Sequence, residues 1–124
     1  MQISLYPTKE QIQALLADPT EGPVVMVNLL RFKPGGEAAY QRYAREMRKL
    51  VEGRGGRFVW SGRVTAQVVG DGGVGFQVVG LVEYPSRKAC VEITTSKDVA
   101  TIGVHRTEGL EGQWLLATTA TPLG

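Results

Sequence analysis

The chain of 124 residues lacks several features that would mark a protein class. A single cysteine, Cys90, excludes an internal disulfide and fits a reducing compartment, so we expect a cytoplasmic location. No uncharged apolar run approaches the ~20 residues of a membrane span, and the first residues lack the basic and apolar regions of a signal peptide. We therefore expect no membrane partner.

The chain also has little excess of either charge and only one histidine. The formal net charge is +2, and across residues 42–52 the basic residues are interleaved with acids, so we expect no nucleic-acid partner. His105 is the only histidine, and a metal site would need further ligands at metal spacing. We expect no metal and no cofactor. Haem binding through His105 as a single axial ligand stays open as an alternative, beside a solvent-facing or dimer-contacting histidine.

What the chain does contain is a strongly apolar segment, residues 23–32. It follows a Gly-Pro turn, is rich in β-branched residues and predicts a strand that is covered on both faces. Asn28 lies in the middle of this strand, where a polar side chain is disfavoured. Its amide could meet a bound ligand, or it could pair with backbone or partner-chain groups.

Capping signals and periodicity predict the other elements. Thr8, followed by Gln11 three residues later, indicates a capping box for a helix over 8–17. A second helix over 37–53 carries an apolar stripe at helical spacing. The remaining expected elements are strands over 57–69, 76–84 and 114–119, and helices capped by Ser86 and Ser96, the second of them over 97–108.

The strands over 57–69 and 76–84 are predicted to pair as a hairpin through the loop 71–75. Pairing Gly70 with Phe76 makes one face almost wholly apolar and places Arg63 opposite Glu83. The two charged residues would then form a structural cross-strand pair, or the arginine would hold an anionic ligand.

The element order predicts an α+β fold, the ferredoxin-like βαββαβ arrangement, after an N-terminal helical extension over residues 1–22. All of residues 1–124 are expected to form one domain. Two helices can cover only one face of the four-stranded antiparallel sheet, yet the strand over 24–32 is apolar on both faces. We therefore expect a homodimer that packs sheet on sheet.

Several short motifs resemble one known family. They are Pro23–Phe32, Ala39-Tyr40-x-x-Tyr43, Gly55-Gly56-Arg57, Trp60–Val64, Val82–Arg87, His105–Thr107 and Leu115–Thr119. Through them, about residues 8–119 resemble the family catalogued as domain of unknown function 1330, within the dimeric α/β-barrel superfamily. The resemblance implies a ferredoxin-like fold and a homodimer with facing sheets, but no established reaction. Elsewhere the superfamily includes cofactor-free monooxygenases and haem-degrading enzymes, which is a looser analogy.

Two functions fit these observations. The first is a cofactor-free small-molecule enzyme or binder, monooxygenase-like by the superfamily analogy, with a pocket between helices and sheet or in the dimer lumen. The second is a non-catalytic dimerisation or accessory module whose polar residues are structural. A buried amide and an Arg/Glu pair on one sheet favour the first. Its candidate ligand-binding residues are Asn28, Trp60, Arg63, Glu83 and His105.

Overall fold

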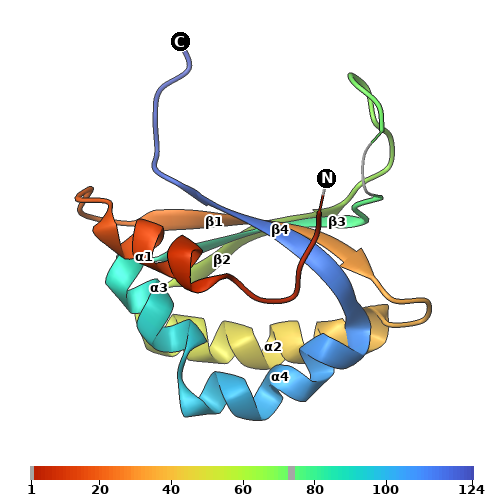
Figure 1. Ribbon diagram of the computed structural model, residues 1–124, viewed down its shortest axis with the longest axis horizontal. Helices are drawn as coiled ribbons and strands as arrows, with labels where there is room; N and C mark the ends of the chain where they lie inside the picture. Colours follow the sequence, from red (N-terminus) through yellow and green to blue (C-terminus); the bar gives the residue numbers. More distant parts are fainter. Residues whose placement is uncertain (1, 73–74) are drawn as a thin grey trace.

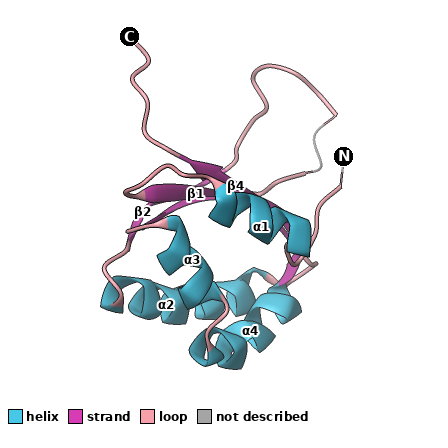
Figure 2. Cartoon of the chain, turned by 60° about the vertical axis from the view of Figure 1, so that its left-hand side comes forward, coloured by secondary structure: helices cyan, strands magenta, loops and turns pink. Residues whose placement is uncertain are grey.

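The computed structural model describes residues 2–72 and 75–124 and forms two layers, a sheet and a set of helices (Figure 1, Figure 2). The elements along the chain are α1 (Lys9–Ala17), β1 (Val24–Phe32), α2 (Glu37–Gly53), β2 (Arg57–Arg63), β3 (Val78–Tyr84), α3 (Arg87–Thr94), α4 (Lys97–Gly109) and β4 (Leu110–Thr118). The four strands are antiparallel in the order β2-β3-β1-β4, and the helices lie on one side of them. This is the predicted ferredoxin-like α+β fold with an additional N-terminal helix. Among the described residues, no helix combines the length and the apolarity that a membrane crossing requires.

Local capping signals fix where the helices begin. Thr8 Oγ1 accepts a hydrogen bond from the Gln11 N–H at 3.1 Å, and the Thr8 N–H donates to Gln11 Oε1 at 2.8 Å, which completes the capping box of α1. Ser86 and Ser96 accept hydrogen bonds from backbone N–H groups three residues later and so begin α3 and α4. The helix starts predicted from these residues are confirmed.

The core lies between β1 and the helices. The even-numbered side chains of β1 face the helices, and all of them from Val24 to Phe32 are at most 8% exposed except Asn28, which is half-buried. The main cluster consists of Val24, Met26, Met47, Val51, Tyr84, Cys90 and Ile93. Asn28 is therefore the polar interruption of an otherwise buried apolar row.

We expect the Cys90 thiol to be nearly inert in the folded protein. It is 4% exposed, and burial raises its pKa to about 11, so only ~0.1% of it is thiolate at about pH 8. Reaction with the aromatic disulfide 5,5′-dithiobis(2-nitrobenzoate) should be at least ~100-fold slower in native than in denatured protein. Equal rates in the two states would contradict this assignment.

The predicted hairpin forms, but its predicted register is wrong. Arg63 lies opposite Val78, and Glu83 lies opposite Arg57. Arg63 and Glu83 are therefore at opposite ends of the paired strands and cannot form the expected contact.

The length of the hairpin loop explains the error. The loop covers 64–77 rather than 71–75, and its residues 73 and 74 lie outside the described part of the chain. The alternation that predicted a longer strand includes Val68, which is 89% exposed in this loop. Alternating apolar residues indicate a strand only where a neighbouring strand is in reach.

The last strand begins at Leu110, not at residue 114 as predicted. Gly109 is the last residue of α4, and its backbone packs against Gly36. A Cβ at Gly109 would lie 2.7 Å from the Tyr40 backbone nitrogen and closer still to the Gly36 carbonyl oxygen. Glycine here lets α4 approach the start of α2, and the fully buried Leu110 then continues directly into the sheet.

Candidate functional site

The face of the sheet away from the helices is apolar and is covered by the described chain only at Trp114, where the Phe76 ring packs at 5.1 Å between centroids and the Gln2 carbonyl accepts from the indole. Its residues, here called the open face, are Val25, Val27 and Leu29 of β1, Val79 and Leu81 of β3, Trp114 and Leu116 of β4, and Trp60 of β2. Leu116 is 49% exposed and Trp60 is 59% exposed. Contiguous apolar surface of this kind marks an interaction face in most proteins.

Two segments rise from the sheet on the side of the open face (Figure 1, Figure 2). They are the loop 64–77, apart from its two undescribed residues, and the C-terminal residues 119–124. Val69 in the loop is 88% exposed and Leu123 in the tail is 99% exposed. Apolar side chains thus flank the open face as well as forming it.

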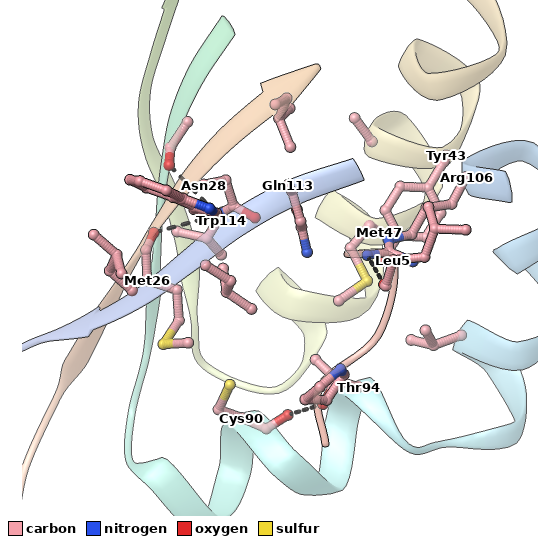
Figure 3. Close-up of a pocket in the computed structure, with 18 of the residues that line it drawn as sticks. Leu5, Met26, Asn28, Tyr43, Met47, Cys90, Thr94, Arg106, Gln113 and Trp114 are labelled. Atoms are coloured by element: carbon pink, nitrogen blue, oxygen red, sulfur yellow. Dashed lines mark hydrogen bonds between the residues drawn. The ribbon is translucent and has the colours of Figure 1, made fainter. Parts of the chain in front are cut away.

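On the helix side of the sheet there is a cavity of about 1880 Å³. All four helices contribute to its wall, together with the segment before α1 and residues of all four strands. Most of these strand residues face the helices, but Trp60, Leu81, Trp114 and Leu116 belong to the open face. Figure 3 shows the part between the strands, α2, α3 and the N-terminal segment. The cavity is partly open to solvent, and it exceeds the ~300–1,000 Å³ of a typical small-molecule site. It has room for a small organic molecule.

Two amides on the sheet line this cavity (Figure 3). Asn28 of β1 donates from Nδ2 to the carbonyl oxygens of Met26 and Gly80 at 3.3 and 3.4 Å, both of which are long hydrogen bonds. Gln113 of β4 has a buried Oε1 without a partner in the described chain. An unpaired buried acceptor costs ~1–3 kcal/mol, so a ligand N–H or O–H placed there would recover that cost.

Two tyrosines of α2 line the cavity from the helix side. The Tyr40 ring packs on Phe32 and Tyr43, with 5.5 and 5.4 Å between ring centroids. Burial raises the pKa of both phenols above the ordinary value, and the nearby Arg106 partly opposes the rise. Both hydroxyls therefore stay protonated near neutral pH. Neither has a hydrogen-bond partner among the described residues, so both can donate to a ligand.

Arg106 of α4 is fixed beside Tyr43 (Figure 3). Its guanidinium donates to the Leu5 carbonyl oxygen and lies 5.3 Å from the centroid of the Tyr6 ring. The Trp114 indole N–H donates to the Gln2 carbonyl oxygen at 2.7 Å. These contacts hold the segment before α1 against the sheet and α4, where it forms one wall of the cavity.

The five residues predicted from the sequence do not form one cluster. Asn28 and Arg63 both line the cavity, and Arg63 is paired there with Glu37 of α2 at 2.6 Å. Trp60 reaches the edge of the cavity, but its ring lies over Gly62. If Gly62 carried a side chain, its Cβ would lie 2.6 Å from the ring atom Cζ2 of Trp60. The structure thus brings two of the five to the cavity and a third to its edge.

Glu83 and His105 do not line the cavity. Glu83 pairs with Arg57 on the open side of the sheet, at 3.0 Å. His105 is a partly buried residue of α4, and its buried Nδ1 has no partner among the residues that the structure describes. Residues 2–72 and 75–124 contain no group of three His, Cys, Asp or Glu side chains that could hold a metal ion.

Several polar residues of the cavity were not selected from the sequence, and the four that bear most on ligand binding are Tyr40, Tyr43, Arg106 and Gln113. The tyrosines belong to the apolar stripe of the helix over 37–53, and such a stripe marks a packed face without showing whether a void lies in front of it. Gln113 lies opposite Leu30 and so on the same sheet face as Asn28, which only the pairing of β1 with β4 reveals.

Comparisons with known proteins agree with this fold. The sequence profile of a family described as "Domain of unknown function (DUF1330)" matches residues 29–120. No curated protein matches the chain. The crystal structure of RPA0582 from Rhodopseudomonas palustris, described as a protein of unknown function, is 29% identical with a TM-score of 0.85 over 98% of this chain and 100% of that one.

More distant solved structures share the fold alone. A DABB family protein with a ferredoxin-like fold from Mesorhizobium loti is 15% identical, with a TM-score of 0.58 over 84% of this chain and 100% of that chain. A proposed antibiotic biosynthesis monooxygenase from Caulobacter crescentus is 13% identical, with a TM-score of 0.60 over 82% of this chain and 92% of that chain.

Proposed function

The chain belongs to the family described as domain of unknown function DUF1330, and on that premise we propose that it binds a small organic molecule in the cavity between sheet and helices. One observation carries the proposal: Gln113, whose buried Oε1 has no partner in the described chain, is among the residues that line a cavity large enough for a ligand. Buried polar atoms are almost always paired, so an orphaned acceptor beside a void indicates that its partner arrives from outside.

We further propose that the protein is a homodimer whose two open faces pack together. An antiparallel sheet facing water alternates apolar and polar side chains, whereas the outward residues of β1 before Arg31 are all apolar. A two-fold interface uses the same patch twice, and an apolar patch is complementary to itself. Most of the cavity wall is formed by the helices and the helix-facing side of the sheet, so ligand binding and dimerisation use largely different residues, although Trp60, Leu81, Trp114 and Leu116 belong to both surfaces.

For the molecule bound in the cavity we propose cofactor-free oxygenation as the reaction class, and this proposal rests on the superfamily analogy. An electron-rich phenol would supply the electrons: one atom of O₂ enters the ring, the other leaves as water, and the phenol becomes a quinone. The Caulobacter crescentus relative contributes only the fold to this idea. Oxygen consumption in the presence of a bound phenol is the assay, and no residue of the cavity is assigned a catalytic role.

We expect Gln113→Leu to weaken binding of 2-naphthamide by about 10-fold, because the amide N–H of this probe loses its acceptor. The free variant should be as stable as wild type or up to about 2 kcal/mol more stable, because an unpaired buried oxygen is removed. Isothermal titration calorimetry measures the first effect, and denaturant unfolding measures the second. Gln13→Leu, at an exposed position of α1 outside the cavity, is the control and should change neither.

Two outcomes would count against ligand binding. The first is a wild-type protein that does not bind 2-naphthamide at millimolar concentration. The second is a Gln113→Leu variant that loses stability but binds the probe unchanged. Either would favour the alternative, a dimerisation module in which the amides of the sheet are structural.

A further inference from the structure

The charges around the cavity are almost all neutralised. The charged residues that line it are Asp18, Glu37, Arg48, Arg63, Arg87 and Arg106. Three ion pairs account for most of them: Arg87 with Asp18 at 3.5 Å, Arg63 with Glu37 at 2.6 Å, and Arg48 with Glu52 at 2.6 Å. Among the described lining residues, only Arg106 has no carboxylate within 4.0 Å. The cavity therefore presents one uncompensated positive charge.

The contacts of Arg106 hold it in place without removing its charge. The Leu5 carbonyl oxygen accepts from Nη2, and the Tyr6 ring lies against the guanidinium. Both partners are neutral. A guanidinium has five N–H donors in a planar fork, so donors remain after the bond to Leu5. A cation that is anchored but not neutralised beside a cavity is suited to an anion from outside.

Two further donors lie beside this cation. Figure 3 shows Tyr43 next to Arg106, and the Tyr40 ring packs on Tyr43 with 5.4 Å between ring centroids. The guanidinium partly opposes the rise that burial causes in the pKa of each phenol. Both hydroxyls are protonated near neutral pH, and neither has a partner in the described chain. The cavity wall thus gathers a guanidinium and two hydroxyl donors, and among the described residues no carboxylate pairs with the guanidinium.

We infer that the ligand of this cavity is a monocarboxylate whose carboxylate binds Arg106 and the hydroxyls of Tyr40 and Tyr43, and whose otherwise apolar body carries an N–H or O–H donor for Gln113 Oε1. This inference rests on the proposed function and names its ligand class. The apolar body would lie against the methionines of β1 and α2, Met26 and Met47, which line the same space (Figure 3).

The charge balance favours a carboxylate over a phosphate. A carboxylate carries one negative charge and accepts two parallel N–H bonds from one guanidinium. A phosphate dianion would call for a second cation, and the other cavity arginines, Arg48, Arg63 and Arg87, are already paired with carboxylates.

A matched pair of probes tests the inference: 2-naphthoate and 2-naphthamide have the same ring system and differ in charge. Calorimetry at neutral pH should show that wild-type protein binds 2-naphthoate at least ~10-fold more tightly. Arg106→Gln should weaken 2-naphthoate binding by about 10–100-fold and leave 2-naphthamide binding within ~3-fold. Arg54→Gln, which removes an arginine outside the cavity, is the control and should change neither affinity.

A second variant distinguishes the loss of a ligand contact from a disturbed fold. Arg106 also anchors Leu5, so Arg106→Gln could disturb the N-terminal segment. Tyr43→Phe keeps that anchor and should still weaken 2-naphthoate binding several-fold while sparing 2-naphthamide. Tighter or equal binding of 2-naphthamide by the wild type would overturn the carboxylate inference and leave the proposed function standing. Failure of both probes to bind would overturn both.

Discussion

Val27→Glu is expected to convert the proposed dimer to a monomer without unfolding the subunit. Val27 lies at the centre of the open face, between Leu81 on β3 and Leu116 on β4. In a monomer the new carboxylate would face water and cost little. In a sheet-on-sheet dimer two carboxylates would be buried near the two-fold axis, and each unpaired buried charge costs several kcal/mol. We expect the dissociation constant to rise by at least ~1,000-fold.

Light scattering coupled to size-exclusion chromatography measures this effect. The matched control is Leu16→Glu, which places the same charge at a 48% exposed leucine of α1, outside the open face. The control should stay dimeric, and both variants should keep the circular dichroism of wild type. Wild-type protein that is monomeric at micromolar concentration, or a Val27→Glu variant that remains a dimer, would refute the interface.

Gly109→Ala should destabilise the fold by about 2–4 kcal/mol, a large effect for one methyl group. The added Cβ would lie 2.7 Å from the Tyr40 backbone nitrogen and 3.1 Å from the Tyr40 Cβ, with the Gly36 carbonyl oxygen closer still. Backbone atoms cannot rotate away as a side chain can, so α4 would have to separate from α2.

Gly103→Ala on the same helix is the matched control for this substitution. A Cβ at Gly103 meets nothing within 4 Å, so the change should stabilise α4 by up to about 1 kcal/mol. Urea unfolding of the two variants should therefore give changes of opposite sign. If Gly109→Ala unfolds within about 0.5 kcal/mol of wild type, the close approach of α4 to α2 is not as tight as described.

The fold could be predicted largely because its signals are local. The capping box at Thr8 and Gln11 and the serine caps of α3 and α4 each specify a helix start within four residues of sequence. The hairpin register could not be predicted in the same way. The residues around Val68 have the alternation of a strand, and whether they pair depends on where β3 begins.

Only those parts of the candidate site that leave a local signal in the sequence could be predicted. An amide in an apolar strand is visible in the sequence, so Asn28 was identified before its cavity was known. Arg106 and Gln113 come from other elements, and only the packing of α4 and β4 brings them to the cavity. Glu83 was misplaced because its predicted role depended on the wrong register, and its partner is Arg57.

A crystal structure of the protein with 6-bromo-2-naphthamide tests the central claim most directly. The anomalous signal of bromine locates the probe independently of any assumption about where it binds. Binding in the cavity predicts a bromine peak between the sheet and α2, with the probe amide within hydrogen-bond distance of Gln113 Oε1. A bromine peak on the open face alone, or a cavity filled by side chains in the crystal, would contradict the claim.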